Sequence, residues 1–204
     1  MGLAESLDEA VERQPHVVLV HGIHSAEGTT NMRRLIPYFE AQGFRVTVFE
    51  YGWLGVVRAR WANPGIARRL AALVRESDHL VCHSNGAAVA WMAMKNHNMK
   101  CRHVSLIAPA LDNDKRMLGS IWTDIYHNRC DHVVWLARLL WWHSWGSMGR
   151  DGCSDPRALA SGHTNIDVAN HAALPTICGH LDYFAAHILP RFAPWLVRRH
   201  LERA

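Results

Sequence analysis

Six short apolar runs divide the chain, and longer segments with helical periodicity lie between them. The run HVVLV, residues 16–20, is continuous rather than alternating, which is typical of a strand buried on both faces of a sheet. The other predicted strands cover residues 44–49, 80–82, 103–108, 120–127 and 165–169. Strands that alternate with helices predict an α/β fold, a three-layer α/β/α sandwich with a mostly parallel central sheet of about six strands. We expect residues 1–204 to form one such domain.

Prolines and possible caps set the expected helix boundaries. Asn63-Pro64 predicts a cap with proline at the first helical position, followed by a helix over Gly65–Glu76. The other predicted helices cover residues 32–42, the segment from Ala87 to about Met94, residues 133–142, and a last region after His180 that Pro190 and Pro194 break.

The sequence Cys82-His83-Ser84-Asn85-Gly86 stands where the third predicted strand meets a helix of small residues. A serine on such a sharp strand-to-helix turn matches the nucleophile elbow of serine hydrolases. The usual pattern is Gly-x-Ser-x-Gly, and Cys82 replaces its first glycine here. The positions two before and two after the serine approach each other closely and must be small, as Cys82 and Gly86 are. Ser84 is therefore the candidate nucleophile.

A nucleophilic serine requires an acid and a base, which follow later strands in the order Ser, Asp, His. Two loops offer the acid: Asp131 follows the fifth predicted strand, whereas Asp112 and Asp114 follow the fourth. Both loops lie at the carboxyl ends of the strands, where ligands bind to parallel sheets. The residues alone leave this choice open.

The chain contains fifteen histidines, so several compete for the role of base. His180 lies beyond the last predicted strand, after Gly179 and before an aromatic-rich helix, and is the leading candidate. The alternatives are His163, His171 and His187. We expect most other histidines to be structural or exposed.

Four features follow one another over about residues 17–184. They are a His-Gly pair after the first strand, the elbow, an aspartate after a later strand, and a Gly-His pair near the C-terminus. With this ordered set the chain resembles the α/β-hydrolase superfamily, and it is similar to compact esterases and lipases without a cap domain. The resemblance favours Asp131 as the acid, because Asp-x-Val-Val leading into a helix is common in its acid loop. It also implies an oxyanion hole formed by the backbone N–H groups of Ile23 and Asn85.

The function implied is a serine hydrolase that cleaves carboxylic esters through an acyl-enzyme intermediate, with Ser84, His180 and Asp131 as the triad. A thioesterase, amidase or acyltransferase would use the same triad, and a non-catalytic binding protein on this fold is the alternative from another class. The expected partner is a small-molecule or lipid-like ester. The pattern makes no prediction of the oligomeric state.

Charge and motifs argue against nucleic-acid binding and against a metal-dependent function. The net charge is only +4, and the basic residues are spread along the chain. They do not form the clustered basic patch that nucleic-acid binding requires. The sequence has no His-Glu-x-x-His and no paired cysteines, and His21-x-x-His24 and His79 with His83 are only weak ligand patterns. We therefore expect neither a cofactor nor a metal site.

Five widely spaced cysteines predict reduced thiols, and the polar N-terminus does not match a signal peptide. No apolar run is long enough to span a membrane, so we expect a cytoplasmic protein without a stable membrane anchor. The segment 134–148 is rich in tryptophan, namely Trp135, Trp141, Trp142 and Trp145. It forms either core packing or a flap that borders the acyl pocket.

Overall fold

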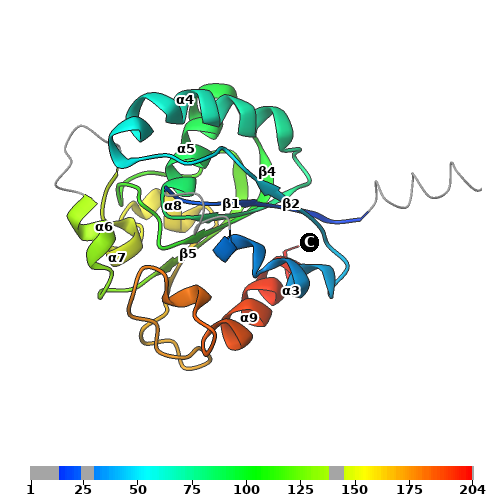
Figure 1. Cartoon of the computed structure of the whole chain (residues 1–204), viewed down its shortest axis with the longest axis vertical. Coiled ribbons are helices and arrows are strands. Elements are labelled where there is room, and N and C mark those ends of the chain that lie inside the picture. Colours follow the sequence, from blue (N-terminus) through cyan, green and yellow to red (C-terminus); the bar gives the residue numbers. More distant parts are fainter. Residues whose placement is uncertain (1–13, 24–29, 138–144, 204) are drawn as a thin grey trace, which may run out of the picture.

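The computed structural model describes residues 14–23, 30–137 and 145–203, and a single parallel sheet organises them (Figure 1). Its strand order is β2-β1-β3-β4-β5-β6. The strands are β1 (His16–Val20), β2 (Arg45–Phe49), β3 (His79–His83), β4 (Cys101–Ile107), β5 (Ser120–His127) and β6 (His163–Asp167). All five neighbouring pairs are parallel, which confirms the predicted α/β sandwich with six strands.

Helices cover both faces of the sheet, as Figure 1 shows, with α4 (Val56–Leu73) and α5 (Asn85–His97) on one side. The opposite side carries α3 (Ile36–Glu40) and α9 (Leu189–Leu201). Successive strand residues point to opposite faces, so the sheet packs against two hydrophobic clusters, one on each face. Further helical elements are α6 (His132–Ala137), α7 (Met148–Asp151), α8 (Pro156–Ala160) and the 3₁₀ turn η1 (Asp182–Phe184).

The predicted cap at Asn63-Pro64 is wrong, because α4 begins at Val56 and continues through Pro64. Asn63 is 1% exposed and hydrogen bonds with Asn85 instead of capping a helix. Burial of the apolar face of α4 outweighs the local cost of an internal proline.

The C-terminal helix also differs from the expectation. Neither proline breaks α9: Pro190 lies in its first turn, where an N–H group is not required, and Pro194 lies inside the helix. The helix continues because it buries Phe192 and Leu196 against the sheet. The last strand, β6, begins at His163, two residues before the predicted start.

Within the described residues, no helix is both long and apolar enough to cross a membrane.

Two glycines, one closely packed and one in open space, provide a test of the packing between α5 and β1. A Cβ atom at Gly86 would lie 2.6 Å from the carbonyl oxygen of Val20, whereas a Cβ atom at Gly65 in α4 meets nothing within 4 Å. We expect Gly86→Ala to lower the free energy of unfolding by about 1–3 kcal/mol because backbone must move. The control Gly65→Ala should raise it by about 0.5–1 kcal/mol through helix propensity. Denaturant unfolding measures both; equal effects would contradict the tight contact.

Candidate active site

Ser84 occupies the sharp turn between β3 and α5. Its backbone angles are φ 54° and ψ −121°, outside the regions that non-glycine residues normally adopt. Its N–H donates to the carbonyl oxygen of Ile107 at 3.0 Å, which ties the turn to the neighbouring strand β4. A strained residue held in this way between a buried strand and a helix is a feature of functional sites.

Asp131 and His180 meet at the same edge of the sheet. The Nδ1 atom of His180 lies 2.8 Å from Oδ2 of Asp131, and the aspartate is fully buried. The other carboxylate oxygen, Oδ1, accepts the N–H of Val134 at 3.1 Å. Because Asp131 accepts from Nδ1, the Nε2 atom of His180 carries a lone pair. This tautomer suits a general base.

Ser84 and His180 line one cavity of about 40 Å³. Its other lining residues are largely apolar: Ile23, Asn85, Ala110, Val133, Val134 and Trp145. The cavity therefore combines a hydroxyl group and an imidazole with an apolar wall.

The two residues predicted to form the oxyanion hole, Ile23 and Asn85, lie beside Ser84 in this lining. Asn85 is the first residue of α5, so its backbone N–H has no acceptor one turn earlier in the helix. The positive end of the helix dipole lies at the same point. The position of Asn85 thus suits stabilisation of a negative oxygen.

Solved structures with the same architecture place this chain among known folds. MGS-MChE2, an α/β hydrolase enzyme from the metagenome of sediments from the lagoon of Mar Chica, Morocco, matches with a TM-score of 0.55 and 15% identity over 93% of this chain and 91% of that one. Mouse α/β hydrolase domain-containing protein 10 matches with a TM-score of 0.59 and 12% identity over 92% and 88%. The chain has the α/β-hydrolase fold.

A third structure, carboxylesterase CesB from Bacillus subtilis, matches with a TM-score of 0.50 and 10% identity, covering 94% of this chain and 84% of that one. Comparison with protein-family models and with curated proteins finds no match to the sequence. At these identities the likeness concerns the fold, and the chemistry rests on the residues of this chain.

The side chain of Asn85 makes contacts that the sequence did not predict. Its amide pairs reciprocally with that of Asn63, at 2.9 and 3.1 Å, and its Oδ1 also accepts the indole N–H of Trp145 at 2.8 Å. All three side chains are buried. Because these hydrogen bonds fix the start of α5, they position the residue that follows Ser84. No local pattern joins residues so far apart in sequence.

Tyr51 supports the loop on the other side of Ser84. Its hydroxyl group donates to the carbonyl oxygens of His21 and Gly22, at 2.6 and 2.7 Å, and its ring stacks on that of His21 with centroids 4.0 Å apart. Burial raises the pKa of Tyr51 well above its usual range, so it remains a donor. These contacts fix the backbone just before Ile23. The polar-aromatic loop that follows the second predicted strand was the only sequence signal for them.

The alternative acids and bases have other partners. The carboxylates of Asp112 and Asp114 lie 3.7 and 3.0 Å from the ammonium group of Lys115. Among the alternative bases, His163 accepts the N–H of Met117 at 3.1 Å. The ring of His171 packs against Trp195, and His187 is exposed.

Most tryptophans of the predicted flap have side chains outside the described residues. Trp141, Trp142 and the side chain of Trp135 lie there, so the flap stays a hypothesis. Trp145 is 5% exposed and belongs to the hydrophobic core as well as to the cavity wall.

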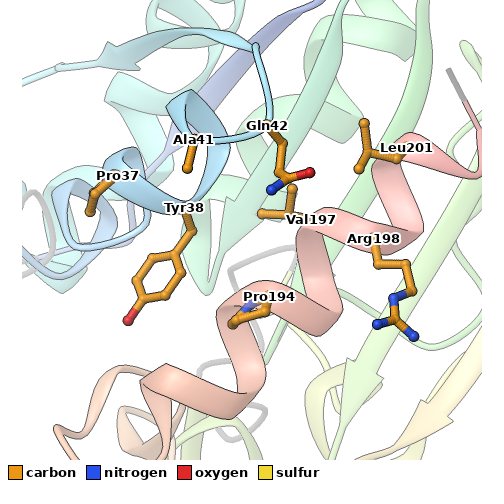
Figure 2. A pocket seen from close by; sticks show the side chains of 8 residues that line it. All are labelled: Pro37, Tyr38, Ala41, Gln42, Pro194, Val197, Arg198 and Leu201. Atoms are coloured by element: carbon orange, nitrogen blue, oxygen red, sulfur yellow. The ribbon is translucent and has the colours of Figure 1, made fainter.

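Two further features lie away from this cavity. A surface hollow of about 390 Å³ lies between α3 and α9 (Figure 2), and none of the candidate catalytic residues lines it. Among the described residues, His79, His103 and His200 form a group that could hold a metal ion. The sequence, which has no His-Glu-x-x-His and no paired cysteines, did not predict a metal site, and these three residues share no spacing motif.

His83 packs behind the proposed base. Its Nε2 atom donates to the carbonyl oxygen of His180 at 3.2 Å, and the two rings lie 4.9 Å apart. The side chain is 3% exposed, and its Nδ1 atom has no hydrogen-bond partner among the described residues. Burial, and next the nearby His180, lower the pKa of His83 to about 3. A neutral His83 is therefore part of the folded state.

This pKa predicts a dependence of stability on pH. The unfolded chain, with a histidine pKa near 6.5, binds a proton between about pH 6.5 and 3 that folded His83 does not bind. The free energy of unfolding should therefore fall as the pH drops through this window, by up to about 1.4 kcal/mol per pH unit for this one group. In His83→Gln that contribution is absent. Denaturant unfolding at several pH values should give a steeper fall for the wild type; parallel curves would contradict the neutral buried state.

Proposed function

We propose that this protein is a serine hydrolase that cleaves carboxylic esters through an acyl-enzyme intermediate. One observation carries the proposal: His180, hydrogen bonded to the buried carboxylate of Asp131, lines the same cavity as Ser84 on its strained turn. A nucleophile, an oriented base and a buried acid are the groups that acyl transfer requires. The α/β-hydrolase fold supports the proposal by analogy.

In the first step, Ser84 Oγ attacks the ester carbonyl carbon while Nε2 of His180 accepts the hydroxyl proton. The imidazolium that forms donates through Nδ1–H to Asp131, whose charge stabilises it. Asp131 stays in place because it also accepts the N–H of Val134. His180 then donates its Nε2 proton to the departing alcohol.

The negative oxygen of the tetrahedral intermediate needs donors that are already in position. We assign the backbone N–H groups of Ile23 and Asn85 to this role. Contacts of Tyr51 and Asn63 hold the two segments that carry these N–H groups. In the second step His180 activates a water molecule, which releases the acid and restores Ser84.

The cavity wall indicates the kind of ester. Ala110, Val133 and Trp145 offer apolar surface and suit the acyl chain rather than a charged group. The space bounded by the described residues, about 40 Å³, fits a short acyl group. We therefore assign short-chain esters as the preferred substrates. One structural neighbour is named a carboxylesterase, which agrees with the cleavage of carboxylic esters.

Variants of the two competing aspartates test the triad. Asp131→Asn should lower kcat for a nitrophenyl ester by roughly 10³–10⁴-fold, because the amide favours the wrong imidazole tautomer. The matched control Asp112→Asn changes an exposed carboxylate that contacts Lys115 and should leave kcat nearly unchanged. Ser84→Ala should abolish acyl-enzyme turnover. Comparable losses in both aspartate variants, or wild-type rates in Ser84→Ala, would exclude this triad.

A series of esters with increasing acyl length tests the substrate assignment. We expect kcat/KM for acetyl and propionyl esters to exceed that for octanoyl esters by roughly tenfold or more. Val133→Ala shortens a side chain that lines the cavity and should reduce this ratio, whereas Leu136→Ala on the same helix α6 should not. Both side chains are more than half exposed, at 56% and 53%, but only Val133 lines the cavity. A wild-type preference for octanoyl esters would contradict the short-chain assignment.

A further inference from the structure

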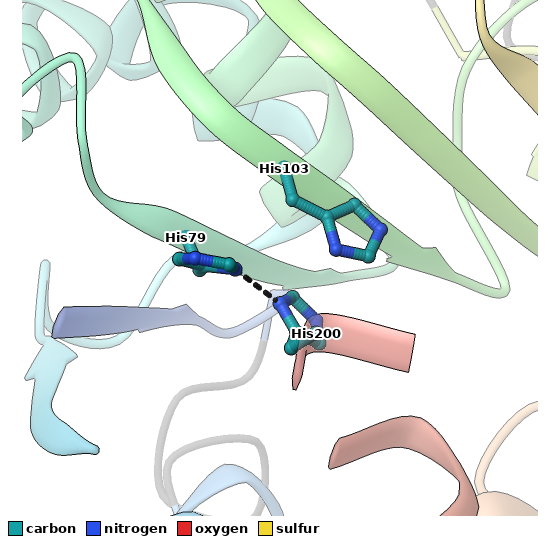
Figure 3. Close-up of side chains that lie close together, drawn as sticks. All are labelled: His79, His103 and His200. Atoms are coloured by element: carbon teal, nitrogen blue, oxygen red, sulfur yellow. Dashed lines mark hydrogen bonds between the residues drawn. The ribbon is translucent and has the colours of Figure 1, made fainter. Parts of the chain in front are cut away.

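A second cluster of polar residues lies at the opposite end of the sheet from Ser84. His79 is the first residue of β3, His103 is its register partner on β4, and His200 comes from α9 (Figure 3). The three side chains are 0–1% exposed. The proposed esterase chemistry uses none of them, because Ser84 follows the last residue of β3.

The three rings converge on one point. One nitrogen of each imidazole lies within 4.8 Å of the others, and the Nδ1 atoms of His79 and His200 are 3.0 Å apart. In a tetrahedral zinc site with Zn–N distances of 2.0–2.1 Å, ligand nitrogens lie about 3.3 Å apart. No separation here exceeds that value by more than about 1.5 Å, a difference that small rotations of the rings would close. Figure 3 shows the rings facing one another from two strands and one helix.

The outer nitrogens of two of these rings are held by other side chains. His103 Nε2 lies 3.1 Å from Oδ2 of Asp124, and His200 Nε2 lies 2.9 Å from the hydroxyl oxygen of Ser105. Arg199 donates to both oxygens of Asp124, at 3.0 and 2.8 Å, and keeps it ionised. Histidines that bind metals commonly donate their second N–H to a carboxylate or another oxygen, which fixes the tautomer.

One buried atom in the cluster has no hydrogen-bond partner among the described residues. Nδ1 of His103 is fully buried, and its ring donates through Nε2 to Asp124. Nδ1 is therefore a lone-pair acceptor without a donor, which costs free energy in a protein interior. A cation at the centre of the cluster would satisfy it.

We propose that His79, His103 and His200 bind a zinc ion through one imidazole nitrogen each. Three neutral nitrogen ligands suit a borderline divalent cation such as Zn²⁺ and disfavour Ca²⁺ or Mg²⁺, which prefer oxygen. The three histidines supply three of the four ligands of a tetrahedral site. The site is structural, because it joins the last turn of α9 to β3 and β4. The bound ion replaces the contact between the Nδ1 atoms of His79 and His200 with one metal bond to each nitrogen.

Zinc stoichiometry tests the site independently of esterase activity. The full chain, treated with EDTA and then equilibrated with Zn²⁺ and desalted, should retain about one zinc ion per chain. Bound zinc should raise the melting temperature by several degrees, because it binds the folded state only. His103→Gln and His200→Gln should weaken zinc binding by at least about tenfold and remove this shift.

Matched controls separate this site from adventitious binding. His97→Gln removes an exposed histidine, and Cys130→Ser/Cys178→Ser removes the two exposed thiols; both variants should bind zinc like the wild type. Substituted Co²⁺ should give a tetrahedral visible spectrum without a thiolate charge-transfer band. The proposal is overturned if the wild-type chain retains no zinc, if the histidine variants retain as much as the wild type, or if a thiolate band appears. Zinc retention by the wild-type chain tests the proposal even if a histidine variant fails to fold.

Discussion

The close contact between the elbow and the end of β1 is the constraint on which the rest of the site depends. A Cβ atom at Gly86 would lie 2.6 Å from the carbonyl oxygen of Val20, and one at Gly22 would lie 2.9 Å from the Cβ atom of Ser84. Only residues without side chains allow α5 to start this close to β1. The contact brings the loop that carries Ile23 beside the serine, so the proposed nucleophile and both proposed oxyanion donors share one edge of the sheet.

Buried hydrogen bonds hold the groups around this contact in place. Asp131 binds His180 and the backbone of Val134, while the side chain of Asn85 pairs with Asn63. In a water-poor interior such bonds are strong, and leaving any partner unpaired is costly, so the arrangement is fixed before a substrate arrives. The same sheet carries the histidine cluster at its other end. The sheet therefore carries the candidate triad at the carboxyl ends of its strands and, near their amino ends, the histidine cluster to which α9 contributes.

Much of this architecture could be predicted from local pattern. Continuous apolar runs such as residues 16–20 gave the strands, and the polar residues that follow each strand gave Ser84, Asp131 and His180 as candidates. The helix boundary at Asn63-Pro64 was predicted wrongly, because burial of α4 overrides the local signal. Contacts such as Asn63 with Asn85, and the meeting of β3, β4 and α9 at the histidine cluster, depend on tertiary packing. No spacing in the sequence encodes them.

Covalent trapping tests most directly whether Ser84 is a nucleophile activated by His180. The folded protein is treated with a fluorophosphonate, digested, and its peptides are mapped by mass spectrometry. We expect one adduct, on Ser84, that forms far more slowly in His180→Gln although the serine is retained. No adduct on the folded chain, an adduct on another residue, or an unchanged labelling rate in His180→Gln would contradict it.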